Sequence, residues 1–293
     1  MSEESKRTNR NYKDRLFCML FGHDKKNAIS LYNALNGTGY SEDEDIEVTT
    51  IDDAIYINMK NDASFIVDGH MSLFEQQSSL NPNMPLRGLM YFGDLYDSYV
   101  EGKGLNIYGS KLIKIPTPQY FVLYNGTADA PAKEEQKLSD AFAKESPDGM
   151  YEWTATLINL NKGKNEVLLE QCKPLEEYMF FIECVRGFEA KGLESRKAVD
   201  EAVQFCIDAG IMKDFLVKHR AEVISVVLTE FNQRRYEDDL RTQGALSQLF
   251  KSIQRGRMTI EEGIRDAAED FQMSEEEFMN DYESYQKKSK DIQ

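Results

Sequence analysis

The feature that most constrains the fold is an Asp-Gly pair, Asp68-Gly69, between two runs rich in Phe, Ile, Val and Leu. This pattern predicts a β-hairpin, because a type I′ turn needs φ > 0 at both central residues. A two-residue turn fixes the strand register, which places Asp62 opposite Glu75. Since side chains alternate between the two faces of a strand, Asp62, Glu75 and Gln77 share one face.

Two opposed carboxylates destabilise a hairpin, because their Cβ atoms lie only about 5 Å apart. The repulsion is relieved if one acid is protonated, if solvent screens both at an exposed hairpin end, or if a cation binds them. Carboxylate oxygens are preferred ligands of Mg²⁺ (or Mn²⁺), so the pair suits such a cation. Gln77 could position a water or a phosphate. A longer turn would shift the register and separate the acids.

An Asp on one strand followed by Glu-x-Gln on the next, here Asp62, Glu75 and Gln77, resembles the PD-(D/E)XK nuclease superfamily. It is most similar to the recombination-promoting nuclease branch, whose members are also labelled transposases and in which Glu-x-Gln stands in for Glu-x-Lys. The similarity covers residues 11–190 through four segments in order: KDRLFCMLFG, NDASFIVDGHMSLFEQQ, NPNMPLRGLMYFGDLY and KLIKIPTPQYFVLYNGT. The resemblance implies an α/β fold with a restriction-endonuclease-like mixed sheet core flanked by helices. It also implies a metal-dependent DNA endonuclease that hydrolyses phosphodiester bonds.

The resemblance further implies roles for individual residues. Asp62 and Glu75 would hold the metal, Asp14 from a preceding helix would add a ligand, and Gln77 and Arg87 would complete the catalytic set. Asp14 has a simpler role open to it, because an acid in the first turn of a helix stabilises the positive end of the helix dipole. Arg87 begins a helix, where a cation is unfavourable, so it needs a partner. That partner could be Glu75, Gln77, a scissile phosphate or an ordinary surface acid.

A Gly-rich loop carries Lys103, Lys111 and Lys114 within twelve residues, with Tyr108 among them. We interpret these lysines as DNA-backbone contacts close to the catalytic residues. The net charge of −16 opposes nucleic-acid binding, which requires clustered Lys and Arg. It favours an alternative function, a catalytically inactive nuclease-fold protein that acts as a protein- or DNA-binding module.

Local patterns predict the remaining elements of the sheet and its helices. Helical spacing indicates helices over residues 12–21 and 24–35, the second capped by Asp24, and a mostly buried helix from Leu86. Residues 119–124 read as a strand that pairs parallel with the hairpin across this helix. Further strands are expected at residues 46–51 and 152–160, the latter with Trp153 packed against the sheet. Asp52 and Asp53, after the first strand, are alternative acids for the metal.

The chain divides by composition into three parts: a disordered N-terminus (1–10), the nuclease-like domain (11–190) and a helical C-terminal region (191–293). ADAPAKEEQKLSDAF, before the last strand, is expected to be a polar connection. Thr259-x-x-Glu262 and Ser274-x-x-Glu277 are capping-box patterns that predict two short helices. The acidic side chains there disfavour DNA reading, so we expect a protein contact through this region, such as a homodimer.

The sequence excludes several other classes of protein. Its four cysteines lack CxxC spacing and its three histidines lack an HExxH arrangement, which argues against zinc sites and a disulfide framework. The N-terminus is polar, and no run approaches the roughly 20 apolar residues of a transmembrane helix. We therefore expect a soluble, cytoplasmic protein without a membrane partner.

Overall fold

A computed structural model of the chain describes residues 15–22, 24–41, 49–50, 63–144, 151–271 and 273–290. Asp14, Asp52, Asp53 and Asp62 lie outside the described residues. The chain forms two compact units, Met1–Glu230 and Phe231–Gln293. This division falls later than residue 190, where the sequence pattern placed it.

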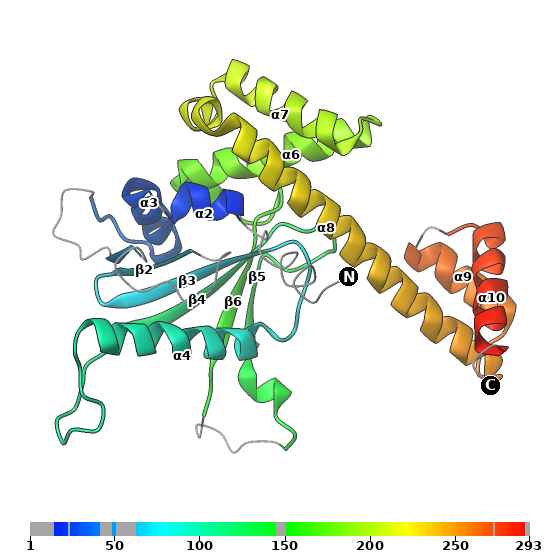
Figure 1. The fold of residues 1–293 in the computed structure, drawn as a ribbon, viewed down its shortest axis with the longest axis horizontal. Helices are drawn as coiled ribbons and strands as arrows, with labels where there is room; N and C mark the ends of the chain where they lie inside the picture. Colours follow the sequence, from blue (N-terminus) through cyan, green and yellow to red (C-terminus); the bar gives the residue numbers. More distant parts are fainter. Residues whose placement is uncertain are drawn as a thin grey trace, which may run out of the picture. The chain divides into compact units, whose positions relative to one another are not determined.

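The first unit is built on a mixed six-stranded sheet with strand order β1-β2-β3-β4-β6-β5 (Figure 1). Strands β1, β2 and β3 pair antiparallel, β3, β4 and β6 pair parallel, and β5 pairs antiparallel with β6. The expected mixed α/β class is therefore confirmed. The strands span Thr49–Thr50 (β1), Ala63–Val67 (β2), His70–Gln77 (β3), Thr117–Tyr124 (β4), Lys133–Lys137 (β5) and Thr154–Asn159 (β6).

The hairpin of β2 and β3 has the turn that its sequence predicts. Asp68 and Gly69 both have positive φ, 47° and 72°, as a type I′ turn requires. The register runs from Val67 opposite His70 to Ala63 opposite Phe74. The predicted register is confirmed over all five described pairs.

Helices cover both faces of the sheet (Figure 1). Helix α4 contacts β4, β5 and β6 on one face, whereas α2 and α3 contact β2 on the other. Asp24 caps α3 as expected, since its Oδ1 accepts hydrogen bonds from two backbone amides of the first turn. The helices of this layer and those that follow it span Arg15–Phe21 (α2), Lys25–Asn36 (α3), Met84–Gly102 (α4), Glu166–Gln171 (α5), Lys173–Ala190 (α6) and Ser195–Ala209 (α7).

Helix α4 crosses the sheet between β3 and β4, which makes these strands parallel as predicted. A Cβ on Gly88 would lie 2.5 Å from Cδ1 of Tyr120 and 3.0 Å from Nε1 of Trp153, so the helix approaches the sheet closely only because residue 88 is glycine. Trp153 packs against Phe92 of α4, with ring centroids 5.0 Å apart. The expected packing of the tryptophan on the sheet is confirmed.

The expectation that KEEQK belongs to a polar connection is wrong. Lys133–Lys137 is instead an edge strand, mostly exposed. Charged side chains on an exposed edge strand discourage pairing with a further strand. The short 3₁₀ helix η1 (Leu138–Ala141) follows it.

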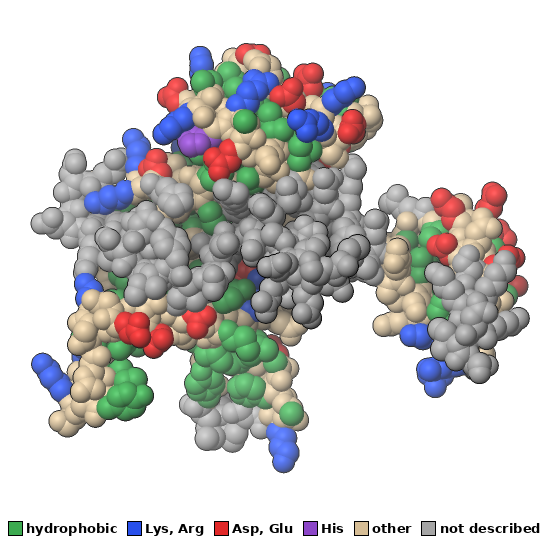
Figure 2. Space-filling model, in the orientation of Figure 1, with side chains coloured by type: hydrophobic (Ala, Val, Ile, Leu, Met, Phe, Trp, Pro, Cys, Tyr) green, Lys and Arg blue, Asp and Glu red, His purple; other side chains and the backbone are tan. Residues whose placement is uncertain are grey.

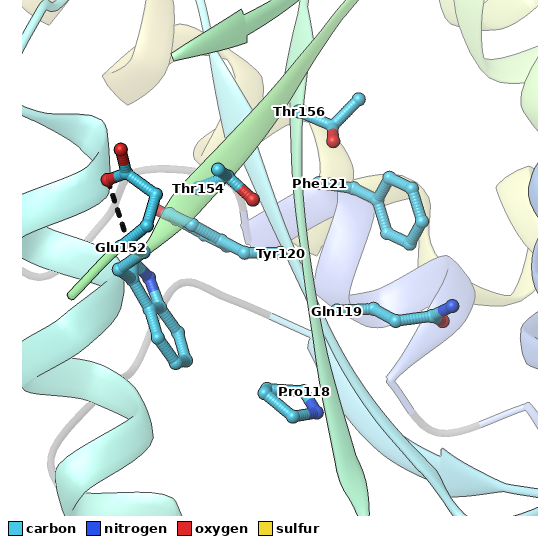
Figure 3. Close-up of a pocket in the computed structure, with 8 residues that line it drawn as sticks. Pro118, Gln119, Tyr120, Phe121, Glu152, Thr154 and Thr156 are labelled. Atoms are coloured by element: carbon cyan, nitrogen blue, oxygen red, sulfur yellow. Dashed lines mark hydrogen bonds between the residues drawn. The ribbon is translucent and has the colours of Figure 1, made fainter. Parts of the chain in front are cut away.

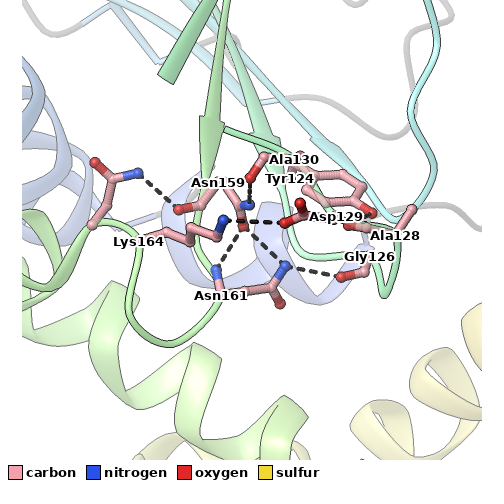
Figure 4. Close-up of polar contacts among 9 residues, drawn as sticks. Tyr124, Gly126, Ala128, Asp129, Ala130, Asn159, Asn161 and Lys164 are labelled. Atoms are coloured by element: carbon pink, nitrogen blue, oxygen red, sulfur yellow. Dashed lines mark hydrogen bonds and ion pairs between the residues drawn. The ribbon is translucent and has the colours of Figure 1, made fainter. Parts of the chain in front are cut away.

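A network of side-chain amides holds the loops after β4 and β6 (Figure 4). Asn159 donates from Nδ2 to the backbone oxygen of Ala130 at 2.9 Å, and its Oδ1 accepts from the backbone and side chain of Asn161. Asn161 in turn donates to the backbone oxygen of Gly126 at 2.9 Å. Because these buried polar groups satisfy one another, we interpret the network as structural.

The second unit is a small helical cluster. Its core contains Leu246, Phe250, Ala267, Phe278 and Tyr282. Both capping boxes form as predicted, since Thr259 and Glu262, and likewise Ser274 and Glu277, exchange side-chain and backbone hydrogen bonds. The helices involved are α8 (Lys213–Gln254, which begins in the first unit), α9 (Ile260–Phe271) and α10 (Glu275–Lys290).

Among the described helices of both units, none combines the length and the apolar composition that crossing a bilayer requires.

Candidate functional site

Glu75 lies in the second half of β3, and its side chain is only 1% exposed. Its neighbours on the same face, Met71 and Leu73, belong to the hydrophobic core that packs against α4. The interpretation of Glu75 as a solvent-screened acid at an exposed hairpin end is therefore wrong. A buried carboxylate needs hydrogen bonds and a compensating charge, which its neighbours must supply.

Three side chains donate to the carboxylate of Glu75. Gln77, two residues later on the same strand face, donates from Nε2 to Oε1 at 2.7 Å. Tyr120 of β4 donates its hydroxyl to Oε2, and Arg87 of α4 forms an ion pair with Oε1. The three donors come from three different elements, so the fold itself positions the acid.

Arg87 lies in the first turn of α4, where the cation requires a partner. Its partner is Glu75, one of the four that the sequence left open. The guanidinium also donates to the hydroxyl of Tyr91, from Nε at 3.2 Å and from Nη2 at 3.0 Å. Burial alone would lower the pKa of Arg87, but the charge of Glu75 and the contact with Tyr91 outweigh it and raise the pKa above the ordinary arginine value. Arg87 is therefore a permanent cation, and its side chain is still 34% exposed.

The structure brings three of the sequence-predicted site residues together: Glu75, Gln77 and Arg87. It does not bring the predicted DNA-binding lysines to them. Arg87 begins α4 and Lys103 follows its last residue, a separation along the helix of roughly 24 Å at 1.5 Å per residue. Lys111 and Lys114 lie in the loop beyond that end, so the expectation that these lysines lie close to the catalytic residues is wrong.

Sequence reasoning missed two tyrosines of the site. Tyr91 is four residues after Arg87 on one helix, a spacing that places side chains in contact, so the pattern could have revealed it. Tyr120 reaches Glu75 from a parallel strand joined by a crossover, and no local signal in the sequence sets that register. His70 faces away from Glu75, because its Nδ1 lies 3.1 Å from the hydroxyl of Tyr32 on α3.

A half-open pocket of about 440 Å³ lies where β4 and β6 begin (Figure 3). Aromatic rings and Pro118 form much of its wall, and Gln119, Glu152 and two threonines add polar groups. Tyr120 lines this pocket and donates its hydroxyl to Glu75, so the pocket adjoins the site. Glu152 at the rim is held by Ser139, which donates from its hydroxyl at 2.6 Å and from its backbone amide at 3.1 Å.

The side chains around Glu75 include oxygen ligands of the kind that a hard divalent cation prefers, but in this structure Arg87 and the amide nitrogen of Gln77 both contact Oε1 of Glu75. A carboxylate and a side-chain amide lie on one strand face, and both groups offer oxygen ligands. The buried carboxylate already has a positive partner in Arg87, a charge that a metal ion could also supply. Within the described residues no group of three or more His, Cys, Asp and Glu gathers at one place, so further protein ligands would have to come from residues such as Asp62.

Comparison of the chain with protein-family models, with curated proteins and with solved structures finds no match.

Proposed function

We propose that this protein is a metal-dependent DNA endonuclease of the recombination-promoting nuclease type, with a restriction-endonuclease-like core. The observation that carries the proposal is the cluster of Glu75, Gln77 and Arg87 at the edge of the buried sheet face. If position 75 served stability alone, an apolar residue would be expected there, because a buried ion pair seldom stabilises a protein more than apolar side chains of similar size. A carboxylate held beside a half-exposed arginine instead suits a site for a phosphate and a metal ion.

Each residue of the cluster has a role in this proposal. Glu75, with Asp62 and Asp14 as further candidates, would hold Mg²⁺ or Mn²⁺. The metal, when bound, lowers the pKa of a water and stabilises negative charge on the phosphoryl oxygens. Gln77 orients Glu75 through its amide, and Arg87 offers its exposed edge to the phosphate. Tyr120 fixes the second oxygen of Glu75.

The test is nicking of supercoiled plasmid at low salt, without metal and with Mg²⁺ or Mn²⁺, by the wild type and by Asp62→Ala and Glu75→Ala. Metal-dependent nicking that both substitutions remove supports the proposal. Nicking that persists in Glu75→Ala contradicts it, because the chemistry would then lie elsewhere.

A second function is favoured by one observation: Arg87 already balances the charge of Glu75. In that case the protein is a catalytically inactive nuclease-fold module that binds protein or DNA, consistent with a net charge of −16. A thermal-shift titration separates the two functions. An inert wild type that Mg²⁺ does not stabilise supports the binding module, whereas Mg²⁺ stabilisation that Glu75→Ala removes supports the nuclease.

A further inference from the structure

The loop between α4 and β4, residues 103–116, differs in charge from the rest of the molecule. It contains Lys103, Lys111 and Lys114 and no acidic residue, in a chain with a net charge of −16. All three lysines are exposed. The loop therefore presents a local positive surface that a polyanion would recognise at contact range.

Large apolar side chains of the same loop are exposed to solvent. Tyr108 is 93% exposed, Leu112 78% and Ile107 60%. Hydrophobic and basic side chains lie side by side where this loop projects from the end of α4 (Figures 1 and 2). Exposed apolar side chains that cluster in this way mark an interaction site rather than an ordinary surface.

Hydrogen bonds hold the loop in a defined shape. Asn106 accepts from the backbone amide of Tyr108 at 3.0 Å through its side chain, and from that of Gly109 at 3.1 Å through its backbone oxygen. At the loop's end, Tyr96 of α4 donates its hydroxyl to the backbone oxygen of Pro116 at 2.7 Å. The fold thus presents the ring of Tyr108 to solvent.

We propose that the 103–116 loop binds DNA that contains unpaired bases, such as a bulge. This inference rests on the proposed nuclease function and names its substrate class. The lysines contact phosphates, Tyr108 stacks on an unpaired base, and Leu112 fills the gap beside it. Stacking suits this loop because every base has a π face, and a fully paired duplex keeps those faces covered.

The position of the loop also predicts how far the unpaired base lies from the phosphate at Arg87 along the DNA. The far end of α4 carries Arg87, roughly 24 Å from Lys103 along the helix. At about 3.4 Å per base pair, this separation corresponds to about 7 base pairs of duplex. An anionic membrane surface would also accept lysines and apolar side chains, but it could not connect the loop with the buried Glu75. DNA is therefore the ligand that could contact both the 103–116 loop and Arg87 at the opposite end of α4.

Equilibrium binding in EDTA tests the inference without requiring cleavage. The probes are a labelled duplex with a short central bulge and the same duplex fully paired. We expect the wild type to prefer the bulged duplex by about tenfold, and Tyr108→Ala to weaken binding to the bulged duplex about 5- to 10-fold with little effect on the paired one. Lys111→Ala should weaken both and reduce the salt slope by about one. Lys197→Ala, an exposed lysine of α7, serves as the control.

Equal affinity for both duplexes, or no effect of Tyr108→Ala on the bulged one, overturns the inference. So does loop-dependent binding to phosphatidylserine vesicles in place of DNA. Failure of the proposed function looks different: loop-dependent binding to the bulge would remain, but metal-dependent nicking would be absent. Nicking that requires Glu75 yet ignores Tyr108 would leave the nuclease standing and remove the loop's role.

Discussion

At the scale of single residues, the contact between Glu75 and Arg87 joins stability to the proposed chemistry. The glutamate side chain is 1% exposed and the arginine 34%, so the pair lies at the boundary between core and solvent. A buried charge that loses its partner is strongly destabilising, which makes the arginine a structural requirement in addition to its proposed contact with phosphate. Any cation that binds Glu75 must compete with Arg87.

The substitution Arg87→Met tests this competition. Without metal we expect the variant to lose about 1–3 kcal/mol of unfolding free energy, less than a fully buried pair would cost, because the arginine is partly solvated. Mg²⁺ should then raise its melting temperature more than that of the wild type, since a cation at Glu75 no longer competes with the guanidinium for Oε1. Nicking should fall by at least about tenfold, because the proposed contact between Arg87 and the phosphate is lost. Thermal unfolding in EDTA and in Mg²⁺, together with plasmid nicking, measures all three.

Arg220→Met is the matched control, because Arg220 forms an exposed ion pair with Asp200. It should change the unfolding free energy by less than about 1 kcal/mol and leave the Mg²⁺ response as in the wild type. An Arg87→Met variant that behaves like this control would show that the pair with Glu75 neither stabilises the fold nor occupies a metal site.

At the scale of elements, the close approach of α4 to the sheet positions Tyr120 against Glu75. We predict that Gly88→Ala destabilises the protein by about 1–3 kcal/mol, since its Cβ would collide with the Tyr120 ring at 2.5 Å. The displaced ring would also disturb the hydrogen bond to Glu75 and reduce nicking. Urea unfolding and nicking rates measure the two effects.

Gly93→Ala, on the same helix, provides the comparison. Apart from the backbone of α4 itself, no atom of the described residues lies within 4 Å of a Cβ at Gly93, so alanine should stabilise the helix by about 0.5–1 kcal/mol and leave nicking intact. If the two alanine variants behaved alike, close packing of α4 on Tyr120 would not be what holds the site.

A buried thiol on α7, which packs against α6, makes the free energy of unfolding depend on pH. Burial raises the pKa of the Cys206 thiol to about 12, and the neighbouring Cys184 and Glu177 contribute further. The unfolded chain, with an ordinary thiol pKa near 9, releases this proton first as pH rises. Stability from this group is therefore complete below about pH 9 and declines from there toward pH 12.

Urea unfolding at neutral pH and at a series of values above pH 9 should show this decline. In Cys206→Ala the free energy of unfolding should start lower but fall less steeply over the same range. Parallel pH profiles for the two proteins would mean that other groups, such as the partly buried Tyr96, cause the loss. The pKa of Tyr96 is likewise raised to about 12 by burial.

Local chemistry explains which elements the sequence could predict. The turn at Asp68-Gly69 and the period-two pattern set the hairpin register, and both capping boxes and the Asp24 cap depend on residues within three positions of each other. The same register placed Glu75 and Gln77 on one face. These predictions succeeded because neighbours in the sequence determine them.

Features set by tertiary pairing could not be predicted in the same way. The strand KEEQK has a charged composition that resembles a loop, and only its partner β6 makes it a strand. Burial of Glu75 and its contact with Tyr120 depend on how α4 brings β4 beside β3. The distance from the lysines to Arg87 follows from the length of α4, which a local sequence pattern does not reveal.

At the scale of the whole molecule, the chain consists of two units whose boundary lies after Glu230. Helical patterning continues without a strong break across residue 190, so composition alone does not locate this division. The second unit has its own apolar core, in which the rings of Phe250 and Phe278 lie 5.2 Å apart. We therefore expect the two units to unfold separately.

Phe278→Ala tests this independence. Removing a fully buried phenylalanine costs about 3–5 kcal/mol, which is enough to unfold so small a unit. Calorimetry should show one transition lowered or lost while the other is unchanged, and nicking should remain near the wild-type rate. Phe92→Ala removes a buried ring of α4 from the core of the first unit, so it should lower or abolish the other transition and leave that of the second unit unchanged. A single transition shifted by both substitutions would mean that the units fold as one.

The central claim is that Glu75 is the catalytic carboxylate, and the most direct test is nicking of plasmid in Mg²⁺ by Glu75→Gln beside Glu134→Gln. Both substitutions remove one negative charge from the same sheet, but Glu134 lies exposed on the edge strand β5. We predict at least about a 100-fold loss of nicking for Glu75→Gln and a rate within about twofold of the wild type for Glu134→Gln. Equal rates for the two variants, with both proteins folded, would contradict the account.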